Sequence, residues 1–365
     1  MTLKRIASVF CVLLLTACSS ATSSADLRPS IDAKLAADAQ RYGIPAQSVL
    51  VMRNGEVLYR TQRGLADTAT GRAVAADDVY AVYSVSKLFA SILILQLVDQ
   101  NRLDLEQPAR LYAPDLPEAW SEVTVGQLLS HTSGLPDFFD GADPQRALPP
   151  TKEDVFRSLA DRPLLFAPGA ETRYGQTNYV VLLSILENLH GASYRDIVRD
   201  RILRPLALND TYLGLAHAPR GRLVSPYRGE NGELVPDPTP PWQDYSIAHA
   251  ELYTTPDDLG AFLTAVAQGE LVRQETLVRA WRPYQLRSGE DGVFAAGWDY
   301  GESGRYREVG LDGGVKVRVR IVFRDESLSD HYVIVYLTNG SRENVWTRTL
   351  LDPIQDITLR DEERR

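Results

Sequence analysis

Cysteine is nearly absent from this sequence: its 365 residues include only Cys11 and Cys18. Both lie in the first twenty positions, in or beside an apolar N-terminal run. If that run is removed as a signal, the remaining domain has no thiol for a disulfide, a nucleophile or a metal site. The five histidines are scattered and lack the spacing of a ligand set. We therefore expect no metal and no other cofactor.

Positive charge and long apolar runs are also in short supply. Acidic residues outnumber Lys and Arg by 48 to 39, so the net charge is −9. This argues against a nucleic-acid binder, whose affinity comes from neutralising phosphates. The apolar stretch 88–98 is too short to span a bilayer and contains Ser91 and Gln96. We expect one globular domain over residues 30–358 and a charged tail over 359–365.

The N-terminus has the order of features found in a bacterial lipoprotein. Two basic residues and an apolar run lead to Leu15-Thr16-Ala17-Cys18, which resembles a lipobox, and a Ser-rich stretch follows. We expect a signal peptide over 1–17 and a lipidated Cys18 that anchors the protein to a membrane through the tether 18–29. Ser19, rather than Asp, favours the outer membrane, facing the periplasm. The alternatives are an ordinary secretory signal and a buried strand with a chance cysteine.

The rest of the chain has strands at both ends and helices in the middle. Two β-rich runs flank Asn54-Gly55, the pair preferred in a type I′ hairpin turn. Thr255 followed by Pro256 is typical of a capped helix start. The Pro-rich stretch 216–245 contains the run PDPTPPW, for which no regular structure is expected. Helices are expected over 30–42 (with Ser30 as cap), 84–100, 125–130, 152–159, 178–189, 194–203, 256–267, 275–281 and 344–357, and strands over 297–299, 306–309, 315–323 and 332–338. The order predicts an α/β (α+β) fold in which one antiparallel sheet is flanked by helices, beside a mostly helical region.

Lysine is rare as well, with five in the chain, yet Lys87 lies in an apolar helix. Ser84 is three residues earlier, on the same helical face and near the helix start, where developing negative charge is favoured. Burial disfavours the ammonium, so this amine can lose its proton and accept one from a serine, as an arginine could not. A partly exposed, snorkelling lysine is the plain alternative. Ser86 and Ser91 are rival partners, but Ser86 points elsewhere and Ser91 lies inside the helix.

A second candidate group is Tyr174-Gly175-Gln176, just before an expected helix. A loop tyrosine can act as an acid or base when a cation is near, and the amide of Gln176 would point the same way in an extended segment. Taken alone, a packed tyrosine and a helix-capping amide would explain these residues better.

Together these runs resemble the serine β-lactamase and D-alanyl-D-alanine peptidase superfamily, in its class C-like branch that includes esterases. Ser84-Val85-Ser86-Lys87 matches its S-x-x-K motif, Tyr174-Gly175-Gln176 stands at its Y-x-N motif, and "LLSHTSGLP" (128–136) and "RPLALNDTYL" (204–213) are typical segments. The resemblance implies that Ser84 is acylated, that Lys87 and Tyr174 move protons, and that Gln176 holds the substrate. It gives the SHTSG turn no catalytic role. It places the active site between the sheet and the helical region.

The third motif of that superfamily, K-T-G or H-x-G, falls on Leu311-Asp312-Gly313-Gly314. The resemblance implies that Gly314 and Ser84 supply oxyanion-hole N–H groups, that Gly313 permits close backbone approach, and that Leu311 replaces a cationic or hydrogen-bonding group. Leu311, Asp312, Gly313 and Gly314 are all expected at the oxyanion and substrate-binding site, although the direction of Asp312 stays open. Strand alternation predicts that Lys316 faces away from Leu311 unless a bulge intervenes. "HAELYTT" (249–255) replaces a Gly-Gly pair of many relatives.

These features predict a serine hydrolase that forms a Ser84 acyl-enzyme with a small-molecule or peptide substrate. The expected substrate is an ester or amide such as a peptidoglycan-like peptide, a β-lactam or a small ester. Because Leu311 replaces the third-motif cation, an esterase or peptidase-like enzyme is expected rather than an efficient β-lactamase. Two alternatives stay open: a non-catalytic binding or sensor protein of the same fold, motivated by Leu311, and an envelope scaffold with a decayed site. The sequence does not indicate the oligomeric state.

Overall fold

The computed structural model describes residues 27–140, 147–237, 242–324 and 328–363. The expected signal peptide and Cys18 lie outside these residues. None of the helices described there is both long enough and apolar enough to cross a membrane.

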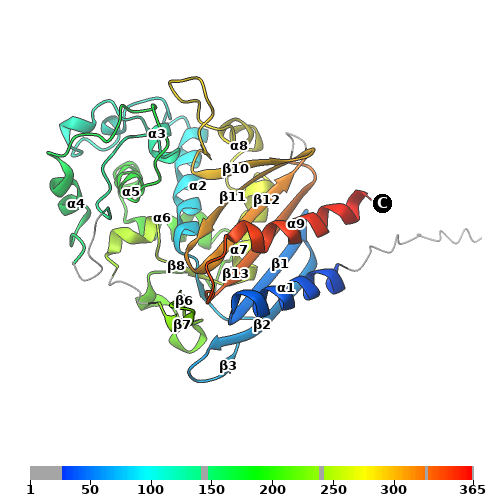
Figure 1. Ribbon diagram of the computed structural model, residues 1–365. Helices are drawn as coiled ribbons and strands as arrows, with labels where there is room; N and C mark the ends of the chain where they lie inside the picture. Colours follow the sequence, from blue (N-terminus) through cyan, green and yellow to red (C-terminus); the bar gives the residue numbers. More distant parts are fainter. Residues whose placement is uncertain (1–26, 141–146, 238–241, 325–327, 364–365) are drawn as a thin grey trace, which may run out of the picture.

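An eight-stranded antiparallel sheet forms one half of the molecule (Figure 1). Its strand order, β3-β2-β1-β13-β12-β11-β10-β9, joins the first hairpin to the last strands by pairing β1 with β13. This confirms the sheet predicted from the sequence. The strands are β1 (Ala46–Arg53), β2 (Glu56–Asp67), β3 (Arg72–Ala73), β9 (Phe294–Ala295), β10 (Trp298–Ser303), β11 (Tyr306–Gly313), β12 (Val317–Phe323) and β13 (His331–Thr338).

The hairpin between β1 and β2 turns at Asn54-Gly55, as predicted. Both residues have positive φ, 50° and 90°, which is what a type I′ turn requires at its two central positions. A second Asn-Gly pair, Asn231-Gly232, closes a hairpin between β6 (Tyr227–Glu230) and β7 (Glu233–Pro236). That hairpin was missed in the Pro-rich stretch, although its turn carries the same signal.

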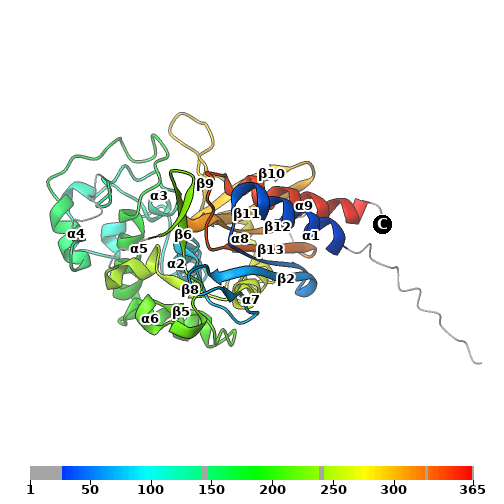
Figure 2. The ribbon, with the colours of Figure 1, turned by 60° about the horizontal axis from the view of Figure 1, so that its bottom comes forward.

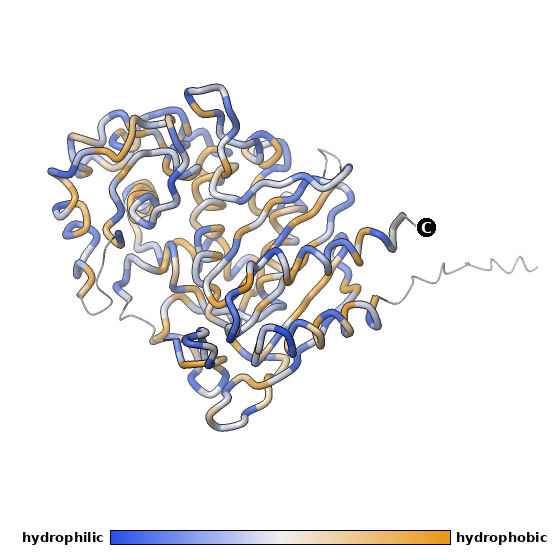
Figure 3. Tube along the Cα trace, in the orientation of Figure 1, coloured by the Kyte–Doolittle hydropathy of each residue, from blue (hydrophilic) through white to orange (hydrophobic). Residues whose placement is uncertain are grey.

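Helices cover both faces of the sheet. On one face lie α1 (Arg28–Tyr42) and α9 (Thr347–Glu363), side by side in Figures 1 and 2. The other face packs on α2 (Ser86–Asp99), α7 (Pro256–Ala267) and α8 (Gln274–Ala280). Figure 3 shows hydrophobic residues concentrated along α2 and the central strands. The sheet thus separates two apolar cores, of which the one around α2 is continuous with the helical region.

The helical region lies beside the sheet, across α2, and contains the middle of the chain (Figure 1). Its elements are α3 (Val125–Leu129), α4 (Lys152–Leu159), α5 (Thr177–His190), α6 (Tyr194–Val198) and a π-helical continuation, Arg199–Leu203. A small three-stranded sheet of β4 (Tyr80–Ala81), β8 (Leu252–Thr254) and β5 (Tyr212–Leu213) leads into α2.

The ends of the domain differ from the predicted boundaries. Helix α1 begins at Arg28 rather than at the expected cap Ser30, because Pro29 occupies its first turn, where a missing N–H costs nothing. Arg28 and Pro29, which the sequence assigned to the tether, therefore belong to α1. At the other end α9 continues to Glu363, with Leu359 buried, so most of the expected tail 359–365 is helical.

Candidate active site

Ser84 lies in a 3-10 turn, Tyr83–Val85, that precedes α2. The sequence predicted one continuous helix from Ser84, whereas the α-helix begins two residues later. The hydroxyl of Ser86 donates to the Tyr83 carbonyl at 2.5 Å and accepts the Leu252 N–H at 3.1 Å. Ser86 therefore ties the turn to strand β8 and is not available as a nucleophile.

Lys87 is completely buried in the first turn of α2. Eleven of the fourteen residues of α2 are buried, and a helix that is apolar on all sides excludes water from every face. The Lys87 Nζ donates to Gln176 Oε1 at 2.8 Å and to the His249 carbonyl at 2.9 Å, and lies 3.5 Å from Ser84 Oγ. Burial lowers the pKa of Lys87 well below its usual 10.5, and the charge of Asp137 opposes that shift. Desolvation therefore shifts the pKa of the amine beside Ser84 in the direction that the sequence predicted.

Tyr174 approaches Ser84 from the helical region. Its hydroxyl donates to Ser84 Oγ at 2.7 Å, while 40% of the residue is exposed, so the ring borders the outside and the hydroxyl points inward. Burial of the hydroxyl raises the pKa of Tyr174, although the bond to Ser84 opposes this shift. The tyrosine is therefore a neutral phenol in the resting site. The Lys87 Nζ lies 4.8 Å from the centre of the same ring.

Gln176 contacts Lys87 directly, so in this structure its amide oxygen orients the amine. Its backbone N–H donates to the Asp137 carboxylate, and a side chain at Gly175 would come within 2.9 Å of that carboxylate. Asp137 is buried, and burial raises its pKa. The sequence reading did not identify Asp137, because nothing in "LPDFF" shows that it turns back toward residues 175–176.

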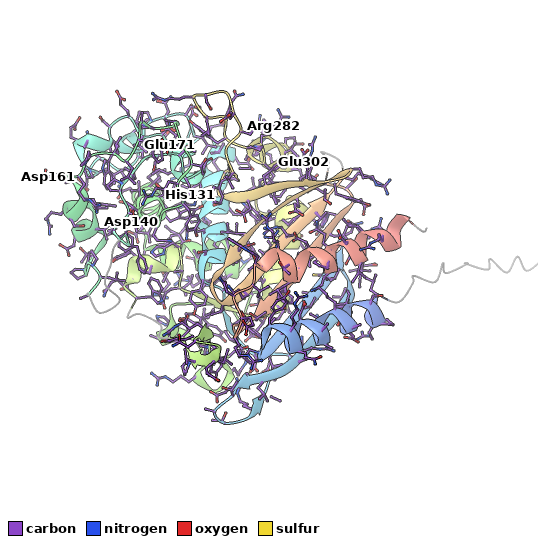
Figure 4. All side chains as sticks on the ribbon, viewed as in Figure 1. His131, Asp140, Asp161, Glu171, Arg282 and Glu302 are labelled. Atoms are coloured by element: carbon purple, nitrogen blue, oxygen red, sulfur yellow. The ribbon has the colours of Figure 1, made fainter. Side chains whose placement is uncertain are left out.

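His131 supports the tyrosine loop from behind. Its ring centre lies 4.5 Å from that of Tyr174, and its Nδ1 accepts the Gly175 N–H at 3.2 Å. The residue has a φ of 56°, so the SHTSG segment does form a tight turn there. Figure 4 labels His131 in the helical region, close to α2. The turn has a positioning role in addition to the structural one predicted.

The end of β11 lies directly against the turn that carries Ser84. A Cβ at Gly313 would come within 2.3 Å of the Val82 carbonyl oxygen, and a Cβ at Gly314 within 2.9 Å of the Tyr83 ring. The predicted close backbone approach is therefore present at both glycines. Tyr83 itself has a φ of 47°, a strained conformation for a bulky residue, and such strain persists only where the surroundings enforce it.

Leu311 and Asp312 point to opposite faces of the sheet. Leu311 faces the α2 core and is only 2% exposed. The position at which the third motif of the superfamily has a cationic or hydrogen-bonding side chain therefore holds a buried apolar one. Asp312 faces α9, where its carboxylate accepts from Arg318 at 2.7 Å and Arg320 at 3.1 Å and from the Thr347 hydroxyl. The inclusion of Asp312 among the substrate-binding residues was wrong, because strand alternation directs it into an ionic cluster behind the site.

The strand assignment on which the prediction for Lys316 depended was also wrong. The sequence placed it on a strand facing away from Leu311, but β11 ends at Gly313 and β12 begins at Val317. The connecting turn contains two residues with positive φ, Val315 at 48° and Lys316 at 66°. Strand alternation does not apply in this turn, so it does not set the direction of Lys316.

The arrangement can perform acyl transfer through serine. The Ser84 hydroxyl lies between a buried amine and a phenol, and two glycines border the turn that carries it. Among the described residues no three His, Cys, Asp or Glu side chains gather to ligate a metal ion.

Comparison with known proteins agrees with this geometry. A family model described as Beta-lactamase matches residues 31–354. Penicillin-binding protein 4* of Bacillus subtilis is 25% identical over 346 residues, which cover 85% of this chain and 71% of that protein. Penicillin-binding protein 4 of Amycolatopsis lactamdurans is 33% identical over 208 residues, 54% of this chain and 52% of that protein.

Two solved structures share the fold across nearly the whole chain. The D-amino acid amidase of Ochrobactrum anthropi in complex with D-phenylalanine has a TM-score of 0.76 at 23% identity, covering 93% of this chain and 100% of that one. EstCE1, a hydrolase with promiscuous acyltransferase activity, has a TM-score of 0.74 at 19% identity, covering 91% and 98%. These structures establish the β-lactamase/transpeptidase-like fold, and the family model, which spans most of the sequence, shows that this chain belongs to the beta-lactamase family.

Proposed function

We propose that this protein is a serine hydrolase that cleaves an ester or amide through an acyl-enzyme on Ser84. The observation that carries the proposal is the position of Ser84 Oγ, 2.7 Å from the Tyr174 hydroxyl and 3.5 Å from Lys87 Nζ. A nucleophile, a base and an acid within reach of one another are the parts that covalent catalysis requires.

The proton path follows from the lowered pKa of Lys87 and the raised pKa of Tyr174. Neutral Lys87 takes the Ser84 proton as Oγ forms a bond to the substrate carbonyl carbon. The Tyr174 phenol then gives its proton to the departing oxygen or nitrogen, and the Lys87 ammonium restores it. The N–H groups of Ser84 and Gly314 hold the carbonyl oxygen while it carries negative charge, a contribution of about 10²–10³ in rate for one such donor. Water releases the acyl group by the reverse path.

The relatives and fold neighbours set the substrates to test. Their names include penicillin-binding proteins, a D-amino acid amidase and an esterase-like hydrolase, so the panel is a penicillin, a D-amino acid amide and an activated short-chain ester. Turnover of any of these that disappears in Ser84→Ala supports the proposal. Ser158→Ala, on the distant helix α4, is the matched control and should keep full activity.

A second candidate function is a non-catalytic binding protein, favoured by the replacement of the third-motif cation with buried Leu311. Under this alternative, Ser84→Ala should bind a penicillin or a peptide as tightly as the unchanged protein does. Neither the variant nor the unchanged protein should turn the ligand over. The hydrolase is preferred, because the Ser84, Lys87 and Tyr174 contacts are complete and a binding protein has no need for a desolvated amine.

We also propose that Cys18 is lipidated and holds the domain at the periplasmic side of a bacterial membrane, with the outer membrane favoured. The support is the sequence order around Leu15-Thr16-Ala17-Cys18 alone. Metabolic labelling with a radioactive fatty acid should mark the full chain and not Cys18→Ala. Incorporation into both would contradict the proposal.

A further inference from the structure

Asp137 is connected to the Lys87 amine through a single residue. The Asp137 carboxylate accepts the backbone N–H of Gln176, and the side-chain oxygen of Gln176 accepts a hydrogen bond from Lys87 Nζ at 2.8 Å. Gly175 leaves room for this arrangement, because a Cβ there would come within 2.9 Å of Asp137 Oδ2. The contacts therefore run from the carboxylate through Gln176 to the amine.

The carboxylate of Asp137 is buried and held in one orientation. The residue is 6% exposed, and its second oxygen, Oδ1, accepts the Phe139 N–H at 2.9 Å. Burial raises the pKa of Asp137, with a smaller contribution from the charge of Asp140, and the two N–H bonds oppose that shift. Each oxygen thus accepts a backbone N–H, an arrangement that favours the ionised form.

The surroundings of the Lys87 amine offer dipoles and rings but no charge in direct contact. The oxygens that Nζ contacts are uncharged and belong to Ser84, Gln176 and His249. Two aromatic rings flank the amine, with centres 4.8 Å away at Tyr174 and 5.3 Å away at Tyr179. Rings stabilise a cation only in part, and a buried cation without a counter-charge is costly. Under the proposed function Lys87 becomes an ammonium, so it needs an anion nearby.

Asp137 can supply this charge, whereas the other titratable neighbours of the amine are neutral. Those neighbours are His131, His249, Tyr174 and Tyr179. Burial lowers the pKa of both histidines, and the charge of Lys87 lowers it further. Burial raises the pKa of both tyrosines; Asp299 also acts on them, but it pairs with Arg320 at 3.3 Å. The charge of Asp137, by contrast, raises the pKa of Lys87 itself.

We infer that Asp137 is a positioning residue for Lys87 and the counter-charge of its ammonium, acting through Gln176. This inference rests on the proposed function. The carboxylate fixes the Gln176 backbone so that Oε1 meets Lys87 Nζ, and its negative charge stabilises the ammonium that forms as Ser84 is acylated. No bond to Asp137 forms or breaks: the proton moves from Ser84 Oγ to Lys87 Nζ, and the carboxylate stays ionised.

The test measures the titration of Lys87 directly by NMR. Lysine labelled with carbon-13 at Cε gives at most five side-chain signals in the full chain, and Lys87→Met identifies the signal of Lys87. Asp137→Asn keeps the size of the side chain and removes its charge. We expect the titration midpoint of Lys87 to move about one pH unit lower in this variant, as for loss of a neighbouring opposite charge. Asp137→Glu, which keeps the charge, should leave the midpoint near its original position.

The kinetics should change in the same direction. The acidic limb of kcat/KM for an activated ester should move to lower pH by the same amount, because the base acts unprotonated and now holds a proton less tightly. Above that limb, kcat/KM should fall about tenfold, as for loss of a charged hydrogen-bonding group. Asp38→Asn is the matched control. Asp38 is also buried and pairs with Lys34 on α1, across the sheet, so its loss should change neither measurement.

A Lys87 midpoint that is equal in Asp137→Asn and the unchanged protein would overturn the inference, even if activity fell, because a merely structural role does not move the midpoint. Thermal unfolding shows whether Asp137→Asn is folded, and Asp137→Ser is a second uncharged variant if it is not. The NMR titration needs no substrate, so the two failures are distinguishable. An unchanged protein that turns over no ester would remove the proposed function, and with it the catalytic role of Asp137, whatever the titration shows.

Discussion

The Lys87 amine lies 2.8 Å from Gln176 Oε1 and 2.9 Å from the His249 carbonyl, with no area exposed to water. Of the 39 basic residues in the chain, 34 are arginine, and an arginine here would stay charged at any pH the protein meets. The two carbonyl oxygens direct the amine, and the absence of water depresses its pKa. Under the proposed function, this position needs a lysine rather than an arginine because only an amine can become a neutral base.

Replacement of Lys87 by methionine should abolish catalysis without unfolding the domain. Loss of a general base lowers rate by about 10²–10⁴, so we expect kcat/KM for an activated ester to fall by at least about a hundredfold. The measurement is steady-state kinetics beside circular dichroism. A folded variant that keeps more than a tenth of the activity would show that Lys87 is not the base.

The pH dependence of kcat/KM should reflect the same group. A base acts only when it is unprotonated, so activity should fall as the pH drops through the pKa of Lys87. Because that pKa lies well below 10.5, the acidic limb should appear well below pH 10.5. Tyr174, whose pKa is raised, should add no loss of activity near neutral pH. A single limb near pH 10.5 would mean that Lys87 titrates as an ordinary exposed lysine.

At the scale of elements, the site is made by three segments that meet: the 3-10 turn before α2, the loop before α5 and the end of β11. The contact between the first and the last depends on glycine. At Gly313 a side chain would come within 2.3 Å of the Val82 carbonyl, and backbone cannot move aside as a flexible side chain can.

Gly313→Ala should therefore separate β11 from the Ser84 turn. We expect a loss of about 1–3 kcal/mol in unfolding free energy, as for other overpacked sites, together with a large fall in kcat. Gly221→Ala is the matched control, because its Cβ would meet nothing within 4 Å and its φ is not positive. Chemical denaturation and ester turnover measure both effects. Equal behaviour of the two variants would contradict the close approach.

Elements with strong local signals could be predicted, and those set by distant contacts could not. Asn54-Gly55 and Thr255-Pro256 define their turn and helix start through their own backbone preferences, and both were predicted. Val315 and Lys316 adopt positive φ without any such preference, because the paired strands force the turn. Strand alternation sets Asp312 opposite Leu311, but its partners Arg318 and Arg320 come from the neighbouring strand, so its local sequence does not indicate the ionic cluster.

At the scale of the molecule, one face of the sheet buries a cluster of ions. Arg318 and Arg320 are 3% and 2% exposed, and they contact acidic residues of β10, β11 and α9. The acidic partners of the two arginines are Asp299, Glu308, Asp312 and Asp352. This cluster joins α9 to the strand that ends at Gly313, so the helix at the far face supports the site.

Arg320→Met should destabilise the whole fold. Breaking a buried ionic group leaves carboxylates without a counter-charge, which costs about 3–5 kcal/mol. Arg157→Met, which removes an ion pair with Asp154 at the surface, should leave the unfolding free energy almost unchanged because solvent screens such pairs. Urea unfolding at pH 7 measures both. A loss for Arg320→Met as small as that for Arg157→Met would show that the cluster does not stabilise the sheet.

The central claim, that Ser84 carries an acyl group during turnover, is tested most directly by mass spectrometry. The domain is mixed with an activated ester or a penicillin, stopped within the first turnovers and digested, and the peptide containing Ser84 is sequenced. We predict an acyl mass on Ser84 that decays with time and is absent from Ser84→Ala. Turnover of either compound with the acyl mass on another residue, or with no adduct at any time, would contradict this account.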